Sequence, residues 1–563
     1  MTILSPAFDS LANLAQHANL SSSRLSYGTA GFRADADKTP LDFVMYRVGC
    51  LIGLRSRVLG GAACGAMITA SHNEQEDNGV KMVEPDGSML DSAWELIADR
   101  VINCKTTSEL KSELEAIPHD PKTLSVSGLV FIGYDTRSSS ERLVQCLIRG
   151  CNSVGAQVEN YHLLSTPVVH HIVRHANGFG HCITMASVEG YSRMLKEGLV
   201  EMLASNTRSS PVNRGRLVID LAGGVGTSVM RTVLANKVKD TCRILLGIPE
   251  ILFANESTNS AVLLNEKCGA EYAQKKRLCP SLFFSSFQNI GADRVASFDG
   301  DADRLVYSYT HPIRGWRLID GDKIATLYAM FVNQELLKAG VNTLSVGLVQ
   351  TAYANGASTH FVCEKMASIQ VKLAKTGVKF VEHAAKEFDI GMYFEANGHG
   401  TVIFSKKAIT LLETMRPKTN RLLGFYKLIN QAVGDAISDC LGVEAILALL
   451  GLSVEHWDNL YEDLPSRQGK IAISDRTLIK CTEDETRVLT PASLQTDIDA
   501  LVASFGTHAR AFVRPSGTED AARVYAEATT TEAANMLALQ VARAAWKAVG
   551  KAGSKEPSES EYL

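Results

Sequence analysis

Residues 295–304 read VASFDGDADR, a short run of apolar and small residues that passes directly into three aspartates, Asp299, Asp301 and Asp303. Such a run is typical of a buried β-strand that ends in a ligand loop. In an extended loop, alternate side chains point to the same side, so the three carboxylates can converge. Carboxylates this close repel one another unless a cation offsets them, and hard oxygen ligands favour Mg²⁺ or Ca²⁺.

A calcium-binding EF-hand loop also begins with acidic residues at alternate positions. Its sixth residue is glycine and its twelfth is glutamate, whereas this chain has Arg304 and Thr310 there. The sequence therefore predicts a magnesium site rather than a calcium sensor.

Four other short apolar runs end in polar or glycine-containing loops, and helical stretches such as residues 140–148 lie between them. These predicted strands are residues 129–134, 217–221, 344–349 and 390–394. Alternation of strand and helix in successive blocks indicates α/β domains with largely parallel sheets, in which ligands collect beyond the carboxyl ends of the strands.

The last hundred residues follow a different pattern. Strand-like residues 511–514 and 523–526 flank one loop and lead into a helix, for which Thr529 and Glu532 predict a capping box. This predicts a smaller α+β domain. The polar residues 550–563 are expected to be disordered.

Length and composition exclude several classes. A chain of 563 residues exceeds the size of one hydrophobic core, and its net charge of −4 includes no basic stripe for nucleic acid. No apolar run reaches the length of a membrane span, and the start of the chain lacks a signal-peptide pattern. Twelve cysteines without a CxxC pair fit a reducing cytosol. We expect a cytoplasmic protein without nucleic-acid or membrane partners.

Residues 67–81 read MITASHNEQEDNGVK and place Ser71 in a polar, exposed loop. Most serines in such a segment are ordinary surface-loop residues without a catalytic role. An acyl-transfer nucleophile is a second option, although the GxSxG elbow is missing. Neither reading is excluded by this segment alone.

Three more loops offer chemistry. Residues 514–518, RPSGT, combine a guanidinium, hydroxyls and a glycine, and Arg523 follows, which suits phosphate binding as well as a polar turn. Residues 395–400, EANGHG, suit hydroxyl recognition and proton transfer, or a simple turn. Residues 223–226, GGVG, hint at a dinucleotide site, but Val229 replaces the third glycine.

Taken in order, these loops and GTAGFR at residues 28–33 resemble the α-D-phosphohexomutase superfamily, whose members have a serine loop, a DGDxDR metal loop, a sugar loop and a C-terminal RPSGT loop. Within this superfamily, the sequences of the motifs are most similar to those of the phosphoacetylglucosamine mutase family, as in TASHNEQEDNGVK, SFDGDADR and FDIGMYFEANGHGT. The resemblance runs from about residue 27 to the final helix.

The resemblance implies a site. Ser71 would carry the phosphate as phosphoserine and share Mg²⁺ with Asp299, Asp301 and Asp303. The residues that would assist proton or charge handling are Arg33, Lys81 and His399. Glu395 and Asn397 would contact sugar hydroxyls, and the remaining substrate-binding residues would be Thr376, Gly377, Val378, Lys379, Arg514, Ser516, Gly517, Thr518 and Arg523.

The resemblance also implies four domains around a central cleft: three successive α/β mixed-sheet domains, at 1–195, 196–310 and 311–455, and the smaller α+β domain at 456–563. The expected reaction interconverts N-acetylglucosamine 6-phosphate and 1-phosphate and feeds UDP-N-acetylglucosamine synthesis, with Mg²⁺ and a hexose 1,6-bisphosphate as cofactors. The partner would be a small-molecule sugar phosphate, and the chain a monomer or weak dimer. Open alternatives are a phosphoglucomutase or phosphomannomutase specificity, a non-catalytic sugar-phosphate binding protein and a serine hydrolase.

Overall fold

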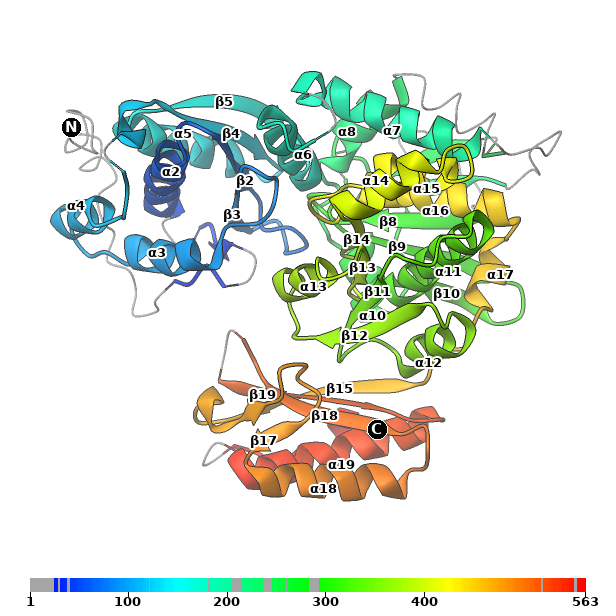
Figure 1. The fold of residues 1–563 in the computed structure, drawn as a ribbon. Coiled ribbons are helices and arrows are strands. Elements are labelled where there is room, and N and C mark those ends of the chain that lie inside the picture. Colours follow the sequence, from blue (N-terminus) through cyan, green and yellow to red (C-terminus); the bar gives the residue numbers. More distant parts are fainter. Residues whose placement is uncertain are drawn as a thin grey trace. The chain divides into compact units, whose positions relative to one another are not determined.

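The computed structural model describes most of the chain, namely residues 25–28, 31–37, 41–120, 122–180, 183–204, 215–235, 246–248, 250–259, 261–282, 293–517, 520–550 and 554–562. Figure 1 shows the chain as a ribbon coloured along the sequence. The chain divides into two compact units. Unit 1 comprises residues 1–320, 397–402 and 412–454, and unit 2 comprises residues 321–396, 403–411 and 455–563.

The first sheet of unit 1 has the strand order β1-β3-β2-β4-β5. Strands β2, β4 and β5 are parallel, whereas β3 runs antiparallel to β1 and β2. The strands are β1 (Phe32–Asp35), β2 (Ala63–Ile68), β3 (Asp77–Val83), β4 (Gly128–Tyr134) and β5 (Ala156–Leu163). The helices of this part are α2 (Leu41–Val58), α3 (Ser92–Ile102), α4 (Thr107–Glu115), α5 (Ser140–Ser153) and α6 (Thr166–Ala176), with a 3₁₀ turn at Thr123–Ser125.

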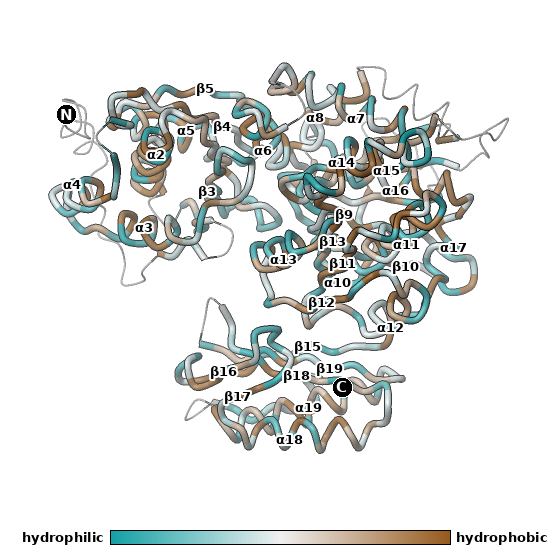
Figure 2. Tube along the Cα trace, in the orientation of Figure 1, coloured by the Kyte–Doolittle hydropathy of each residue, from teal (hydrophilic) through white to brown (hydrophobic). Residues whose placement is uncertain are grey.

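Helices α2 and α5 pack against each other and against this sheet. Figure 2 colours much of α2 as hydrophobic, and most of its residues are buried in the core of this part of unit 1. This burial accounts for the stability of α2 better than helix propensity, since its sequence contains two glycines and several β-branched residues.

The second sheet of unit 1 has the order β10-β9-β8-β6-β7, in which β6 is parallel to both neighbours while β8, β9 and β10 alternate in direction. Its strands are β6 (Leu217–Asp220), β7 (Ile251–Ala254), β8 (Arg294–Phe298), β9 (Leu305–His311) and β10 (Gly315–Ile319). The accompanying helices are α7 (Val188–Leu203), α8 (Gly226–Val233), α10 (Gly269–Lys276), α15 (Asn420–Leu428) and α16 (Ala436–Leu450), with a 3₁₀ turn at Ile183–Met185.

A third sheet has the order β12-β11-β13-β14, and β11 is parallel to both of its neighbours. Its strands are β11 (Val346–Thr351), β12 (Ile369–Ala374), β13 (Ile390–Phe394) and β14 (Gly400–Phe404). The helices here are α11 (Gly321–Ala339), α12 (Gly356–Lys365), α13 (Val378–Ala385) and α14 (Lys406–Thr414).

The C-terminal part of unit 2 holds a three-stranded antiparallel sheet in the order β15-β19-β18 and a short β16-β17 pair. Its strands are β15 (Ser466–Ala472), β16 (Lys480–Cys481), β17 (Val488–Thr490), β18 (Arg510–Pro515) and β19 (Ala521–Glu527). The helices are α17 (Val454–Asp458), α18 (Ala492–Ser504), α19 (Thr531–Val549) and α20 (Glu559–Tyr562), with a 3₁₀ turn at Arg476–Leu478.

These sheets and helices confirm the predicted fold class of α/β mixed-sheet parts followed by a smaller α+β part. The expectation of largely parallel sheets needs one addition, because antiparallel strands extend the first two sheets. The borders at 195, 310 and 455 stay a prediction.

Two predictions for the C-terminal part were wrong in detail. The N-cap of α19 is Thr530, whose hydroxyl accepts a hydrogen bond from Ala533 N at 3.2 Å, rather than Thr529. Residues 554–562 are ordered instead of disordered, because Tyr562 packs into the C-terminal core beside Gly469 of β15. A side chain at Gly469 would begin 2.0 Å from the Tyr562 hydroxyl, so the glycine makes the room.

None of the helices in the described part of the chain combines the length and the hydropathy that a membrane crossing requires.

Candidate active site

Ser71 follows β2 and lies in unit 1 with its backbone in the left-handed region, at a φ of 56°. Its amide donates to Thr69 Oγ1 at 2.7 Å, and that hydroxyl donates to Asp135 Oδ2 at 2.6 Å. An L-residue in this conformation costs about 1–3 kcal/mol and persists only where its surroundings hold it. The loop is therefore built to present this one side chain.

The Ser71 side chain is buried rather than exposed as expected, with 1% of its surface accessible. Asn265 Nδ2 donates to its carbonyl at 2.9 Å, and Arg137 Nη2 donates to it at 3.3 Å. Gly300 also lies close to the Ser71 backbone, since a Cβ added to Gly300 would be 2.9 Å from Ser71 O. The glycine between the first two loop aspartates thus permits the close approach of the metal loop to the serine loop.

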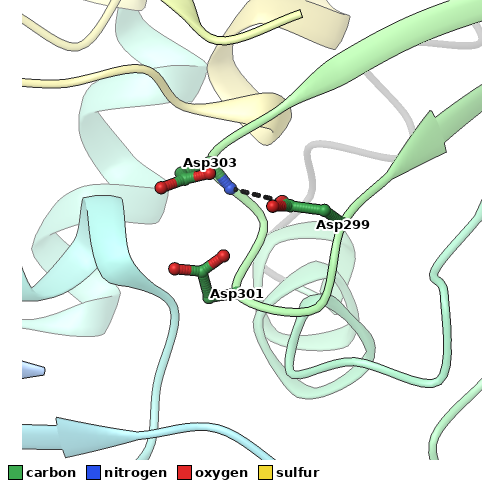
Figure 3. A group of neighbouring side chains, drawn as sticks. All are labelled: Asp299, Asp301 and Asp303. Carbon is green, nitrogen blue, oxygen red and sulfur yellow. Dashed lines mark hydrogen bonds between the residues drawn. The ribbon is translucent and has the colours of Figure 1, made fainter. Parts of the chain in front are cut away.

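The three aspartates after β8 gather their carboxylates as the sequence predicted, with one ligand atom from each lying within 4.8 Å of the others (Figure 3). Ser71 Oγ donates to Asp299 Oδ2 at 3.1 Å, so the serine hydroxyl lies at this cluster. Asp299 Oδ1 accepts from the backbone N of Asp303 at 3.0 Å, which closes the loop.

The charge of this cluster is only partly offset by the protein. Burial, followed by the neighbouring Asp303 and Asp301 carboxylates, raises the pKa of Asp299 well above its usual range. Among the described residues, the buried Oδ1 atoms of Asp301 and Asp303 have no hydrogen-bond partner. Buried carboxylate oxygens that accept no hydrogen bond, gathered in one cluster, fit a hard divalent cation such as Mg²⁺.

Lys81, on β3, reaches the same cluster. Its Nζ donates to Asp301 Oδ2 and to Asp303 Oδ2, both at 2.7 Å. Burial works against the charged ammonium, but the two carboxylates outweigh it and raise the pKa of Lys81. Lys81 therefore stays charged and balances one of the negative charges.

Arg33 lies on β1 opposite Gly79 of β3, which puts its side chain on the same sheet face as Lys81. Burial, and then the nearby Arg304 guanidinium, lower the pKa of Arg33, while Asp301 and Asp303 counteract this. Arg33 is thus a second cation that interacts electrostatically with Asp301 and Asp303.

His399 completes the unit 1 part of the site. Its Nδ1 lies 3.6 Å from Asp303 Oδ1, and its backbone N donates to Asn397 Oδ1 at 2.9 Å. Its Nε2 is buried and has no hydrogen-bond partner among the described residues. An imidazole nitrogen in this position can exchange a proton with a bound ligand.

Apart from Asn397, which belongs to unit 1 together with His399, the other predicted residues lie in unit 2. Glu395 follows β13 and is half-buried. Gly377, at a φ of 124°, precedes the first residues of α13, Val378 and Lys379, and Thr376 N donates to Glu485 Oε2 at 3.0 Å.

The predicted phosphate loop joins β18 to β19, in whose register Arg514 lies directly opposite Arg523. Arg514 Nε donates to Tyr353 Oη at 3.1 Å. Ser516 N donates to Ala521 O at 2.8 Å, and Gly517 is exposed. Thr518 lies outside the described residues.

Unit 1 thus brings together Ser71, the three aspartates, Lys81, Arg33 and His399, and unit 2 brings together Thr376 and Arg514. Sequence reasoning missed Thr166, Asn265, Tyr353 and Glu485. Thr166 at the start of α6 donates through Oγ1 to Asp301 Oδ2 at 2.5 Å. Two further residues that support the Ser71 loop, Asp135 and Arg137, did have a signal in the sequence. They follow directly after the predicted strand at residues 129–134.

Four family models match the chain. Those described as phosphoacetylglucosamine mutase AMG1, domain III and domain II, match residues 320–452 and 182–306. Those described as phosphoglucomutase/phosphomannomutase alpha/beta/alpha domain I and C-terminal domain match residues 51–107 with 119–206, and 478–544.

Among similar proteins is the phosphoacetylglucosamine mutase of Sus scrofa, which is 42% identical over an alignment of 550 residues that covers 96% of this chain and 97% of the relative. The Aspergillus fumigatus N-acetylphosphoglucosamine mutase, solved with GlcNAc-6P and magnesium, is 38% identical with a TM-score of 0.86, over 97% of this chain and 99% of that one. A variant of the same fungal protein, solved with glucose 1,6-bisphosphate, is 38% identical with a TM-score of 0.84, over 97% and 100%.

Proposed function

Because the chain belongs to the phosphoacetylglucosamine mutase family, we propose that it interconverts N-acetylglucosamine 6-phosphate and N-acetylglucosamine 1-phosphate. The observation that carries this proposal is the position of Ser71 Oγ, 3.1 Å from Asp299 Oδ2 in a cluster of three buried carboxylates. A serine hydrolase of the triad type uses an imidazole beside the serine as its base, whereas the Ser71 hydroxyl donates to a carboxylate of the three-aspartate cluster.

Ser71 carries the transferred phosphate in this proposal. Phosphoserine gives its phosphoryl group to O1 of N-acetylglucosamine 6-phosphate, the bisphosphate reverses in the site, and its 6-phosphate returns to Ser71. Mg²⁺, held by Asp299, Asp301 and Asp303, would supply charge neutralisation for the transferring group. The left-handed backbone at Ser71 positions the oxygen without rearrangement, which favours an in-line transfer.

The surrounding cations and the imidazole have distinct tasks. Lys81 and Arg33 balance the negative charge that a second phosphate brings to the buried carboxylates. His399 Nε2 accepts the proton of the attacking sugar hydroxyl or returns it to the leaving one. Arg514 and Arg523 hold the phosphate that is not being transferred, and Thr376 to Lys379 complete that part of the site.

Glu395 and Asn397 bind the sugar hydroxyls in this scheme. An amide both donates and accepts hydrogen bonds and reaches further than a hydroxyl. The EANGHG loop would thereby shape a pocket that admits the 2-acetamido group of the substrate. Asn397→Ser should therefore lower kcat/KM for N-acetylglucosamine 6-phosphate more than for glucose 6-phosphate, by about 0.5–1.5 kcal/mol in transition-state stabilisation. Equal losses for both substrates would make Asn397 a general sugar contact.

The test of the function is turnover of N-acetylglucosamine 6-phosphate and glucose 6-phosphate side by side, with Mg²⁺ and a hexose 1,6-bisphosphate present. We expect a higher kcat/KM for the acetylated sugar. An outright preference for glucose 6-phosphate would assign the chain a phosphoglucomutase specificity. Binding of both sugars without turnover would make it a non-catalytic sugar-phosphate binding protein. We also propose that the product feeds UDP-N-acetylglucosamine synthesis.

A further inference from the structure

Glu485 lies in unit 2 where two of the predicted substrate-binding segments meet, and no local sequence motif marks it. It sits in the turn between β16 and β17 and is buried, with 5% of its surface accessible. Its Oε2 accepts the hydrogen bond from Thr376 N at 3.0 Å and lies 3.6 Å from Arg514 Nε. One carboxylate thus contacts both segments.

The turn that holds Glu485 is fixed by hydrogen bonds within the turn, and its backbone is strained at Glu485. Asp484 Oδ1 accepts hydrogen bonds from Thr482 Oγ1 at 2.5 Å and from Thr486 N at 3.1 Å, and Glu485 N donates to Thr482 O at 3.0 Å. The backbone of Glu485 has a φ of 60°, a conformation that glycine and asparagine adopt more readily. A buried glutamate held in this conformation points to a role for its side chain.

The groups around the Glu485 carboxylate are those that a phosphate would use. Arg514 and Arg523 lie directly opposite each other in the β18–β19 register, an arrangement in which like charges repel unless an anion offsets them. Thr376 contributes a backbone N–H, and its buried Oγ1 has no hydrogen-bond partner among the described residues. Glu485 supplies negative charge to this set of donors.

We propose that Glu485 is a built-in competitor for the phosphate that is not being transferred. This inference rests on the proposed function, and it adds a residue that sets how tightly that phosphate is held. The carboxylate and a phosphate dianion cannot share the Thr376 N–H and the Arg514 guanidinium, because their charges repel. Binding therefore requires Glu485 to withdraw, and its return promotes release.

Such a competitor suits a mutase. The bisphosphate has to leave the Arg514 site once in each turnover, so that its other phosphate can enter. A site of cations and N–H donors alone would hold a dianion tightly and slow this exchange. Glu485 lowers the affinity and thereby speeds the exchange.

The test is isothermal titration of the full-length protein with inorganic phosphate and with N-acetylglucosamine 6-phosphate. Glu485→Gln removes the charge but keeps an oxygen that can accept from Thr376 N, and we expect phosphate to bind roughly 3- to 30-fold more tightly. In turnover, KM and kcat should both fall, because release becomes slower. Glu485→Gly, which suits the left-handed backbone, should change affinity in the same direction.

Glu483→Gln is the matched control, because this residue carries the same charge in the same turn and is exposed. It should leave phosphate affinity unchanged, while Arg514→Ala should weaken it. Weaker or unaltered phosphate binding in both Glu485 variants would overturn the inference and make Glu485 a structural partner of Arg514. Since titration with phosphate needs no turnover, this failure is distinguishable from an absence of mutase activity in the wild-type protein.

Discussion

At the scale of single residues, Ser71 combines full burial with a left-handed backbone, and both serve to hold one hydroxyl at the carboxylate cluster. Its packing contribution is small, since the side chain is a single hydroxymethyl group. The Ser71 hydrogen bond to Asp299 therefore matters more for chemistry than for stability.

We predict that Ser71→Ala abolishes mutase activity, because no other hydroxyl is proposed to carry the phosphate. The loss of one hydrogen bond to a charged partner should lower the free energy of unfolding by no more than about 1.5–3 kcal/mol. Turnover of N-acetylglucosamine 6-phosphate and a thermal melt measure the two effects. Ser504→Ala, which removes an exposed local hydrogen bond, is the control. Near-normal turnover of Ser71→Ala with a bisphosphate activator would exclude the assignment.

A second residue-scale prediction concerns Asp301, a fully buried carboxylate bound by Lys81 and Thr166. Asp301→Asn replaces an anionic ligand of a hard cation by a neutral one, so the Mg²⁺ concentration needed for half-maximal activity should rise at least about tenfold. Titration of activity with Mg²⁺ measures this. Activity that persists unchanged in excess chelator, in either protein, would rule out the metal role.

At the scale of elements, glycines set the distance between packed helices in unit 1. A Cβ on Gly49 of α2 would lie 2.1 Å from Leu147 O of α5, and one on Gly150 of α5 would lie 1.9 Å from Tyr46 O of α2. Helices α7 and α15 approach in the same way, since a Cβ on Gly424 would lie 2.3 Å from Met202 N. Backbone atoms cannot yield as side chains do, so these crossings admit only glycine.

We predict that Gly49→Ala lowers the free energy of unfolding by about 1–3 kcal/mol, because the two helices must separate. Gly53→Ala, one turn further along α2, meets the side chains of Val154 and Ala156 first, at 2.8 and 3.0 Å, and should cost less. Chemical denaturation of both variants tests the difference. Equal losses would mean that α5 adjusts to a new Cβ at either place.

At the scale of the whole molecule, the chain divides into two compact units, and each contains its own hydrophobic core. The three carboxylates belong to unit 1, while Arg514, Arg523 and Glu485 belong to unit 2. Metal and distal phosphate are thus expected to bind to different units. A cytoplasmic location and a monomeric or weakly dimeric state stay predictions.

We predict two calorimetric unfolding transitions, one for each unit. A ligand stabilises the unit that binds it, by about 2.7 kcal/mol at a free concentration of 100 times its Kd. Mg²⁺ should raise the unfolding temperature of one transition and inorganic phosphate that of the other. A single transition that shifts with both ligands would show that the two units unfold together.

The sequence alone determined the fold class and the principal loops. The order of apolar runs and polar loops predicted β8, β11 and β13, because a buried strand requires a continuous apolar stretch whatever lies beside it. The spacing of Asp299, Asp301 and Asp303 predicted the metal cluster, because alternate residues of one short loop share a side. Resemblance to a known family then predicted roles for Ser71, Lys81 and Arg514, and these roles stay predictions.

Only the tertiary structure decided the burial of Ser71, the pairing of Lys81 with two aspartates, and the position of Glu485. Each depends on contacts between segments more than a hundred residues apart, which no local pattern encodes. Tyr562 is a further example, although its partner Gly469 is nearer in the sequence. Its neighbours in the sequence are polar and predicted disorder, yet Gly469 in a distant strand leaves space for the ring, and burial of that apolar surface orders the segment.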